Sequence, residues 1–175
     1  MRSIAAFLAL GLTLLAFSAL SQDASFVEKA AQGGMAEVEA SELAANRATS
    51  DAVRNFGTML VEDHGAANVQ LAEIAKSNGM PLPDTMGESH QEILKTLQAV
   101  EGPRFDQAYL AQMVKSHEES VQLLRSEIAS GQNADLKAYA TDVLPIVEKH
   151  LREAYRLTGR PASSAASPEP EGGSP

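Results

Sequence analysis

Three of the four histidines in this 175-residue chain fall in the middle of separate segments whose apolar residues recur at helical spacing. They are His64, His117 and His150, and each lies on or beside the apolar face of its segment. Side chains that enter the interior of a helix bundle from several helices at one level are typical of an internal metal site. Metal binding through histidine is therefore the most specific chemistry that the sequence predicts.

A carboxylate is expected to assist these histidines. Glu39 shares a helix face with Met35 and Leu43, so it would be a charged residue in a partly apolar stripe. Three imidazoles and one carboxylate suit a tetrahedral zinc site, or a more open site for iron, manganese or copper. Asp63 and Glu118 each adjoin a histidine in the sequence, and they are predicted to accept hydrogen bonds that orient the ligand rings.

The competing interpretation is a metal-free module of the cell envelope, with an interaction or stress-related role, whose histidines are neutral core residues. It predicts hydrogen-bond partners for the rings and an exposed apolar patch elsewhere. The fourth histidine, His90, is predicted to be exposed at the start of a short helix. Valine stands three residues before each core histidine, so the Glu-x-x-His motif of di-iron proteins is absent. No catalytic residues are predicted, and an enzymatic role is disfavoured.

Glycine and proline divide the chain into the elements that must position these histidines. Helices are predicted over residues 25–48, 51–78, 104–130 and 133–158. Ser25 and Glu28 form a capping box at the first start, and a short extra helix is predicted in the link 79–103. The expected fold is an all-α four-helix bundle of up-down-up-down order, with a crossover topology as the alternative.

The predicted helices also indicate how deep two of the histidines, His117 and His150, lie along the bundle. His117 and His150 lie 15 and 18 residues from the short turn near residue 132. At a rise of about 1.5 Å per residue, that difference is about 4.5 Å. The two rings are therefore expected to meet across the interface between their helices.

Three regions are predicted along the chain. Residues 1–21 have a basic start, an apolar run and small residues before a polar stretch, which is typical of a secretory signal peptide. Residues 22–160 form the helical domain, and residues 161–175 form a disordered tail rich in Pro, Ser, Gly and Glu. An exported protein is expected, periplasmic or extracellular, with no membrane span after cleavage.

Composition narrows the possible partners. The net charge of −9 disfavours nucleic acid, because phosphate would approach against like charge. The absence of cysteine excludes disulfides and a lipoprotein anchor, so packing alone must stabilise the exported domain. No particular protein partner is predicted.

Three ordered motifs resemble an exported, ferritin-like bacterial family, domain of unknown function 4142, often labelled an outer membrane or membrane protein. The motifs are Met59–His64 with Asn68 and Leu71, Phe105–His117, and Leu144–Leu151. The resemblance covers roughly residues 25–157. It implies a ferritin-like four-helix bundle outside the cytoplasm and supplies no catalytic activity. The family pattern carries over to Asp63, His64, Asp106, Tyr109, His117, Pro145 and His150. Of these, Asp106 is expected to be a cap or hydrogen-bond anchor, because it precedes His117 by about 16 Å along the helix.

Overall fold

The computed structural model describes residues 5–159, with side chains from Gln22 onward. Five helices and no strand are present in this range, which confirms the all-α prediction. The helices are α1 (Ala5–Arg47), α2 (Asp51–Ser77), α3 (Glu88–Gln98), α4 (Pro103–Ser130) and α5 (Ala134–Thr158). The tail predicted for 161–175 lies outside the described residues.

The boundaries of α2 to α5 follow the punctuation of the sequence. Gly102 precedes α4 with a φ of 63°, and Gly159 ends α5 in the left-handed region with a φ of 71°. Residues with a Cβ rarely adopt these backbone angles, whereas glycine adopts them at little cost in free energy. Glycine at these two positions can therefore begin or end a helix. Asn133 caps α5 by accepting hydrogen bonds from two backbone N–H groups. The predicted helices there are confirmed to within about two residues.

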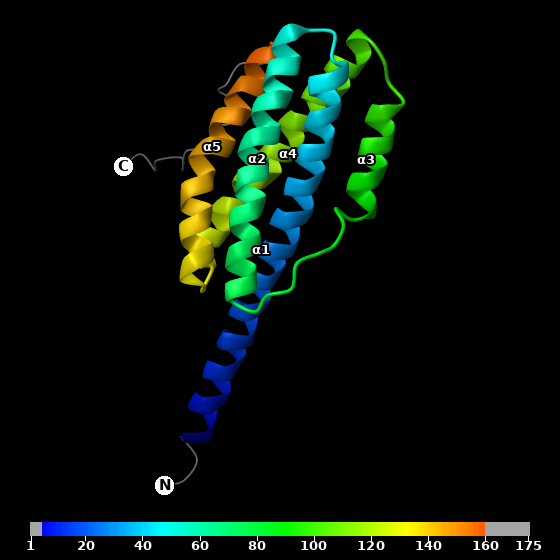
Figure 1. The fold of residues 1–175 in the computed structure, drawn as a ribbon. Coiled ribbons are helices and arrows are strands. Elements are labelled where there is room, and N and C mark those ends of the chain that lie inside the picture. Colours follow the sequence, from blue (N-terminus) through cyan, green and yellow to red (C-terminus); the bar gives the residue numbers. More distant parts are fainter. Residues whose placement is uncertain (1–4, 160–175) are drawn as a thin grey trace, which may run out of the picture.

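The predicted start of the first helix at Ser25 is wrong. Helix α1 runs without interruption from Ala5 through Ser25 to Arg47, and its first turns project beyond the other helices (Figure 1). The preceding run is rich in Ala and Leu and contains no proline, so nothing in its backbone stops the helix before Ser25. No helix among the described residues has the length and apolar character needed to span a membrane. The signal peptide over residues 1–21 stays a prediction.

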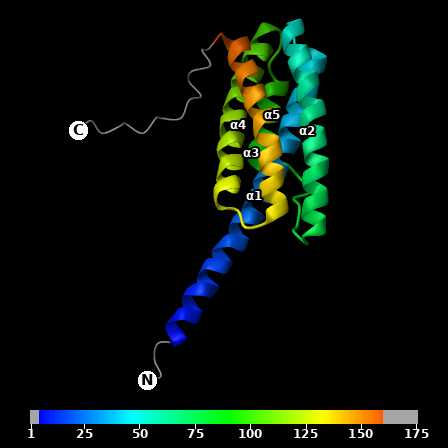
Figure 2. The ribbon, with the colours of Figure 1, turned by 90° about the vertical axis from the view of Figure 1, so that its left-hand side faces the viewer.

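The four long helices pack side by side in the circular order α1, α2, α5, α4 (Figures 1 and 2). Helix α3 lies outside this group, against α1 and α4. Aromatic and aliphatic side chains fill the interior, and the largest fully buried ones include Tyr109, Tyr155, Phe105 and Leu60. The extra helix predicted in the link is present as α3, and Leu97 is its one buried residue.

The predicted up-down-up-down order is wrong. Asp106, near the start of α4, accepts hydrogen bonds from the backbone N–H groups of Thr49 and Ser50, at the start of α2. Helices α2 and α4 therefore begin at the same end and run parallel. The link 79–102 contains α3 and carries the chain from the end of α2 to the start of α4, along the outside of the four long helices (Figure 1). The order is up-down-down-up, which is the crossover alternative. The prediction that Asp106 is a hydrogen-bond anchor is confirmed.

A second carboxylate makes the corresponding contact at the opposite end. Asp23 on α1 accepts hydrogen bonds from the backbone N–H groups of Gln132 and Asn133, at 2.9 and 3.0 Å. This places the start of α5 beside the early part of α1. Asp106 of α4 thus holds the turn of the α1–α2 hairpin, and Asp23 of α1 holds the turn of the α4–α5 hairpin.

Candidate metal centre

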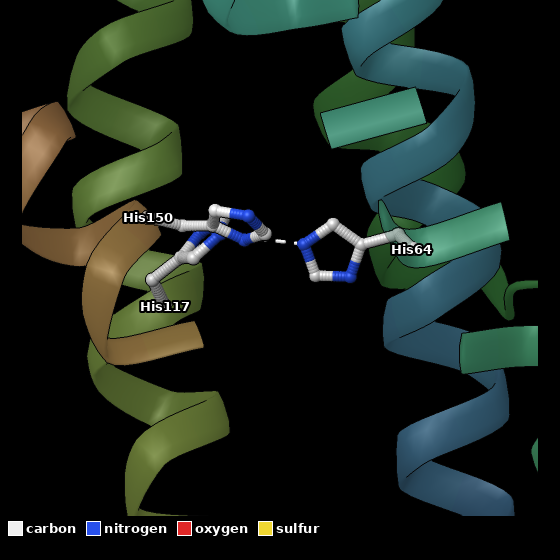
Figure 3. A group of neighbouring side chains, drawn as sticks. All are labelled: His64, His117 and His150. Carbon is white, nitrogen blue, oxygen red and sulfur yellow. Dashed lines mark hydrogen bonds between the residues drawn. The ribbon is translucent and has the colours of Figure 1, made fainter. Parts of the chain in front are cut away.

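Three histidines from three helices meet in the interior of the domain. Helix α2 contributes His64, α4 contributes His117 and α5 contributes His150 (Figure 3). One ring nitrogen from each lies within 4.8 Å of the others. The ring centroids are 5.3 to 5.6 Å apart, and all three side chains are buried. The prediction that these histidines lie at one level is confirmed.

The backbone of α4 determines the tautomer of His117. Its Nδ1 lies 2.9 Å from the carbonyl oxygen of Met113, one helical turn earlier. A carbonyl oxygen only accepts hydrogen bonds, so Nδ1 carries the proton and Nε2 carries a lone pair.

Helix α1 supplies the acceptor that orients His64. The Nδ1 atom of His64 lies 3.2 Å from Oε2 of Glu37, a carboxylate that also accepts only. In the neutral ring, a proton on Nδ1 leaves the lone pair on Nε2. The two Nε2 atoms of His64 and His117 are 3.4 Å apart. The structure pairs these two atoms in a hydrogen bond whose donor is set by the tautomer (Figure 3). With the proton of each ring on Nδ1, the same two atoms would present lone pairs to a shared position.

The third histidine has the opposite tautomer. Nε2 of His150 donates to Oδ2 of Asp63 at 2.8 Å, which leaves the lone pair on Nδ1. This Nδ1 atom is buried and has no hydrogen-bond partner among the described residues. Asp63 is thus an acceptor for a ring, as predicted, but for His150 rather than for its neighbour in the sequence.

The carboxylate beside the histidines is Glu37, and the prediction that Glu39 fills this role is wrong. Glu39 is exposed, whereas Glu37 is buried and contacts His64. In the second half of α1 the buried face includes Glu37, Ala40, Ser41 and Ala44, which places Glu39 on the opposite side. Small residues at spacings of three and four were the signal in the sequence that could have identified this face.

Glu37 is not placed as a direct ligand. Its two oxygens approach the Nδ1 atoms of His64 and His117, at 3.2 and 3.5 Å, on the far side of the rings from their Nε2 atoms. Glu118, the other predicted acceptor, contacts no ring in this way. It accepts a hydrogen bond from the hydroxyl of Tyr155 at 2.5 Å instead, because its side chain lies on the α5-facing side of α4.

Burial determines the charge of the cluster. It lowers the pKa of His117 to about 4, against the opposing effect of Glu37. Burial also lowers the pKa of His150, although its hydrogen bond to Asp63 acts in the other direction. Burial alone would raise the pKa of Glu37, but the adjacent histidines and a hydrogen bond from Ser116 hold it below its usual value. At neutral pH the cluster therefore combines neutral imidazoles at positions 117 and 150 with a buried carboxylate.

The residues present fit a transition-metal ion. Each ring has its N–H directed to an acceptor, which is the usual arrangement around histidine ligands, and each presents a lone pair to the interior. Nitrogens bound to one ion at about 2.1 Å in a tetrahedron are about 3.4 Å apart. The separation of 3.4 Å between His64 and His117 already has this value. The nitrogen of His150 lies at most 4.8 Å from those of the other two rings. Binding all three rings to one ion would therefore require ring movements of up to about an ångström.

Comparison with known proteins supports the fold and assigns no activity. A solved structure of a Streptomyces coelicolor protein of the DUF305 family, described as secreted, is similar in fold with a TM-score of 0.68. The two sequences are 18% identical, and the alignment covers 79% of this chain and 93% of the other. No curated protein matches the chain.

The family assignment comes from the sequence profile of a domain of unknown function, DUF4142, which matches residues 15–157. The match spans all three histidines and both carboxylates that orient them. The chain belongs to the DUF4142 family.

Proposed function

We propose that this domain binds one divalent transition-metal ion through His64, His117 and His150. The direct ligands are Nε2 of His64, Nε2 of His117 and Nδ1 of His150. Glu37 and Asp63 accept the remaining protons of His64 and His150, and their negative charges offset that of the ion. Three imidazoles leave a fourth coordination position for water or a small ligand.

A single observation carries this proposal. Ring nitrogens from three helices lie within 4.8 Å of one another in a buried site, and Nδ1 of His150 has no hydrogen-bond partner among the described residues. A histidine layer that served packing alone would be stabilised by a donor for that nitrogen, since a buried acceptor without a donor costs free energy. The Nδ1 atoms of His117 and His64 lie against Met113 and Glu37, and their Nε2 atoms point toward each other.

The ligand chemistry favours some metals over others. Imidazole suits zinc, copper and iron, whereas manganese prefers oxygen ligands. Because both nearby carboxylates are occupied with ring protons, we propose zinc or copper(II), ahead of iron and manganese. The absent Glu-x-x-His motif counts against a di-iron centre.

The architecture and the location are part of the same proposal. We propose a ferritin-like four-helix bundle, and the single long crossover between α2 and α4 supports this, since ferritin-like folds have one such connection. We also propose that residues 1–21 direct export to the periplasm or the cell exterior. The apolar run in that segment and the fold shared with a protein described as secreted support export.

Metal titration of the purified, untagged chain tests the proposal. After removal of bound metal by a chelator, we expect the protein to take up one zinc ion per chain, as measured by mass spectrometry of metal content. At a zinc concentration of 100 times Kd, the free energy of unfolding should rise by about 2.7 kcal/mol. For a chain of this size, that corresponds to an increase in Tm of roughly 5 to 10 °C.

Alanine substitutions at two histidines provide the test and its matched control. His117→Ala should abolish both the uptake and the increase in Tm. His90→Ala should leave both unchanged, because His90 lies on α3 and its Nδ1 donates to the carbonyl oxygen of Met86. If the wild-type protein takes up neither zinc nor copper and its Tm does not move, the metal-free interpretation with structural histidines replaces the proposal.

A further inference from the structure

A groove of about 550 Å³ lies between the first part of α2 and the last part of α5. The two helices pack side by side in the bundle (Figure 1). The volume of the groove falls within the range of about 300 to 1,000 Å³ that is usual for small-molecule sites. Its walls are made by side chains other than the three histidines, Glu37 and Asp63. The groove is therefore distinct from the candidate metal centre.

The α5 wall of the groove carries its charged side chains. Lys149, Arg152 and Arg156 are exposed, and their spacing of three and four residues places them on one face of the helix. Glu153 is the acidic residue of the same wall. Three positive charges and one negative charge give the groove a formal charge of +2, whereas the whole chain carries −9. The groove is therefore a local cationic site on an acidic protein.

Two of the three cations have charges that the described residues do not neutralise. Glu153 accepts two hydrogen bonds from Arg156, at 2.8 and 2.6 Å. Neither Lys149 nor Arg152 forms an ion pair within the part of the chain that the structure describes. These two residues lie at i and i+3 on the helix, where like charges repel each other. An anion in the groove would be attracted by both charges and would offset that repulsion.

The α2 wall of the groove is mostly apolar. Ala52, Phe56 and Met59 line it, and Phe56 is 2% exposed. Asn55 adds a side-chain amide that donates hydrogen bonds. A ligand that suits both walls therefore combines an anionic group, placed against α5, with an apolar body, placed against α2.

We propose that this groove binds a soluble phosphate monoester with a small apolar body. A phosphate monoester carries close to two negative charges at neutral pH, which matches the formal charge of the groove. The planar guanidinium of Arg152 is suited to donate two parallel hydrogen bonds to phosphate oxygens. The charge of −9 on the chain disfavours an anionic membrane surface as the ligand, because many like charges would have to approach together. Binding does not require a metal.

The experiment compares three probes on the metal-free full chain at about 0.15 M ionic strength, where charges more than about 8 Å apart are largely screened. Phenyl phosphate is the main probe. Inorganic phosphate lacks the apolar ring, and phenyl sulfate has the same shape with a single negative charge. Calorimetry or protein NMR should give phenyl phosphate a Kd of about 1 mM or lower. Phenyl phosphate should bind at least tenfold more tightly than inorganic phosphate and at least threefold more tightly than phenyl sulfate.

Paired substitutions test the location of the site. Lys149→Gln combined with Arg152→Gln should weaken binding of phenyl phosphate at least tenfold. Lys95→Gln combined with Arg104→Gln removes the same charge at exposed positions of α3 and α4 outside the groove, and it should change the Kd less than twofold. Ala52→Leu fills the groove from the α2 side without changing its charge, and it should also weaken binding at least tenfold.

Vesicles of phosphatidylcholine and phosphatidic acid test a membrane lipid as the source of the phosphate monoester. In a flotation assay they should bind the wild type and the groove variant equally. The proposal is overturned if phenyl phosphate does not bind the wild type, or if the control pair weakens binding as much as the groove pair. It is also overturned if vesicle binding depends on Lys149 and Arg152, because the ligand would then be a lipid headgroup. None of these measurements involves metal, so their outcome is separate from that of the metal titration.

Discussion

At the scale of single residues, the candidate site is defined by where three protons reside. Met113, Glu37 and Asp63 each accept one ring N–H, and the lone pairs of the three histidines are left facing the interior. Burial lowers the pKa of His117 to about 4, so that ring stays neutral and able to bind a metal well below neutral pH. The arrangement depends on the acceptors as much as on the rings.

Glu37→Gln should lower the affinity for zinc by about 10- to 100-fold, because it removes the charge that orients His64. Competition with a chelator of known affinity measures this change. Glu39→Gln is the matched control, since Glu39 lies two residues away on α1 and is exposed. Equal effects of the two substitutions would contradict the assignment of Glu37 to the site.

At the scale of helices, the packing of α1 against α2 explains why Glu37 faces inward. The face of α1 that meets α2 is built from small residues, and Gly57 of α2 lies directly against it. A Cβ at Gly57 would stand 2.8 Å from the backbone oxygen of Ser41 and 2.9 Å from the backbone nitrogen of Ala45. Close approach of the two backbones brings Glu37 within reach of His64.

Gly57→Ala should therefore reduce the free energy of unfolding by about 1 to 3 kcal/mol, because backbone atoms cannot yield as a flexible side chain can. Gly65→Ala, eight residues later on the same helix, should have the opposite sign. A Cβ at Gly65 meets no atom within 4 Å, so the gain in helix propensity should stabilise the protein by up to about 1 kcal/mol. Urea unfolding of the two variants gives both values, and two changes of the same sign would contradict this account of the helix contact.

At the scale of the whole molecule, two carboxylates join the hairpins at opposite ends, and one of these ends carries a further titratable group. Glu127 of α4 is 1% exposed, and neither of its oxygens has a hydrogen-bond donor among the described residues. Burial and the neighbouring Asp23 raise the pKa of Glu127 to about 7. Its ordinary value is 4.5, so the folded state binds more protons than the unfolded state between pH 4.5 and about 7.

The stability that Glu127 contributes is therefore present below pH 4.5 and lost as the pH rises through 7. Glu127→Gln does not ionise, and relative to the wild type it should gain roughly 1 to 3 kcal/mol between pH 5 and pH 8, at about 1.4 kcal/mol per pKa unit. The lowered pKa of His117 acts in the opposite direction, but it is common to both proteins and cancels in the difference. Urea unfolding at the two pH values measures the change. A difference that stays constant with pH, as expected for the exposed control Glu92→Gln, would contradict it.

The sequence by itself determined the elements and the level of the histidines. Glycine and proline ended the helices, and apolar spacing identified α2, α4 and α5. The common depth of the histidines was predicted correctly even though the helix order was wrong. His117 lies at the centre of α4, so reversing the direction of that helix leaves it at the same level.

Only the tertiary structure decided the direction of α4, the choice of Glu37 over Glu39 and the position of each ring proton. The direction depends on the path of the link 79–102, which carries no local signal for whether it crosses an end or returns along the side. The choice of carboxylate depends on rotation of α1 about its axis, and two residues change that angle by about 200°. The tautomers depend on acceptors from other helices for His64 and His150, and contacts of that kind do not exist until the helices pack.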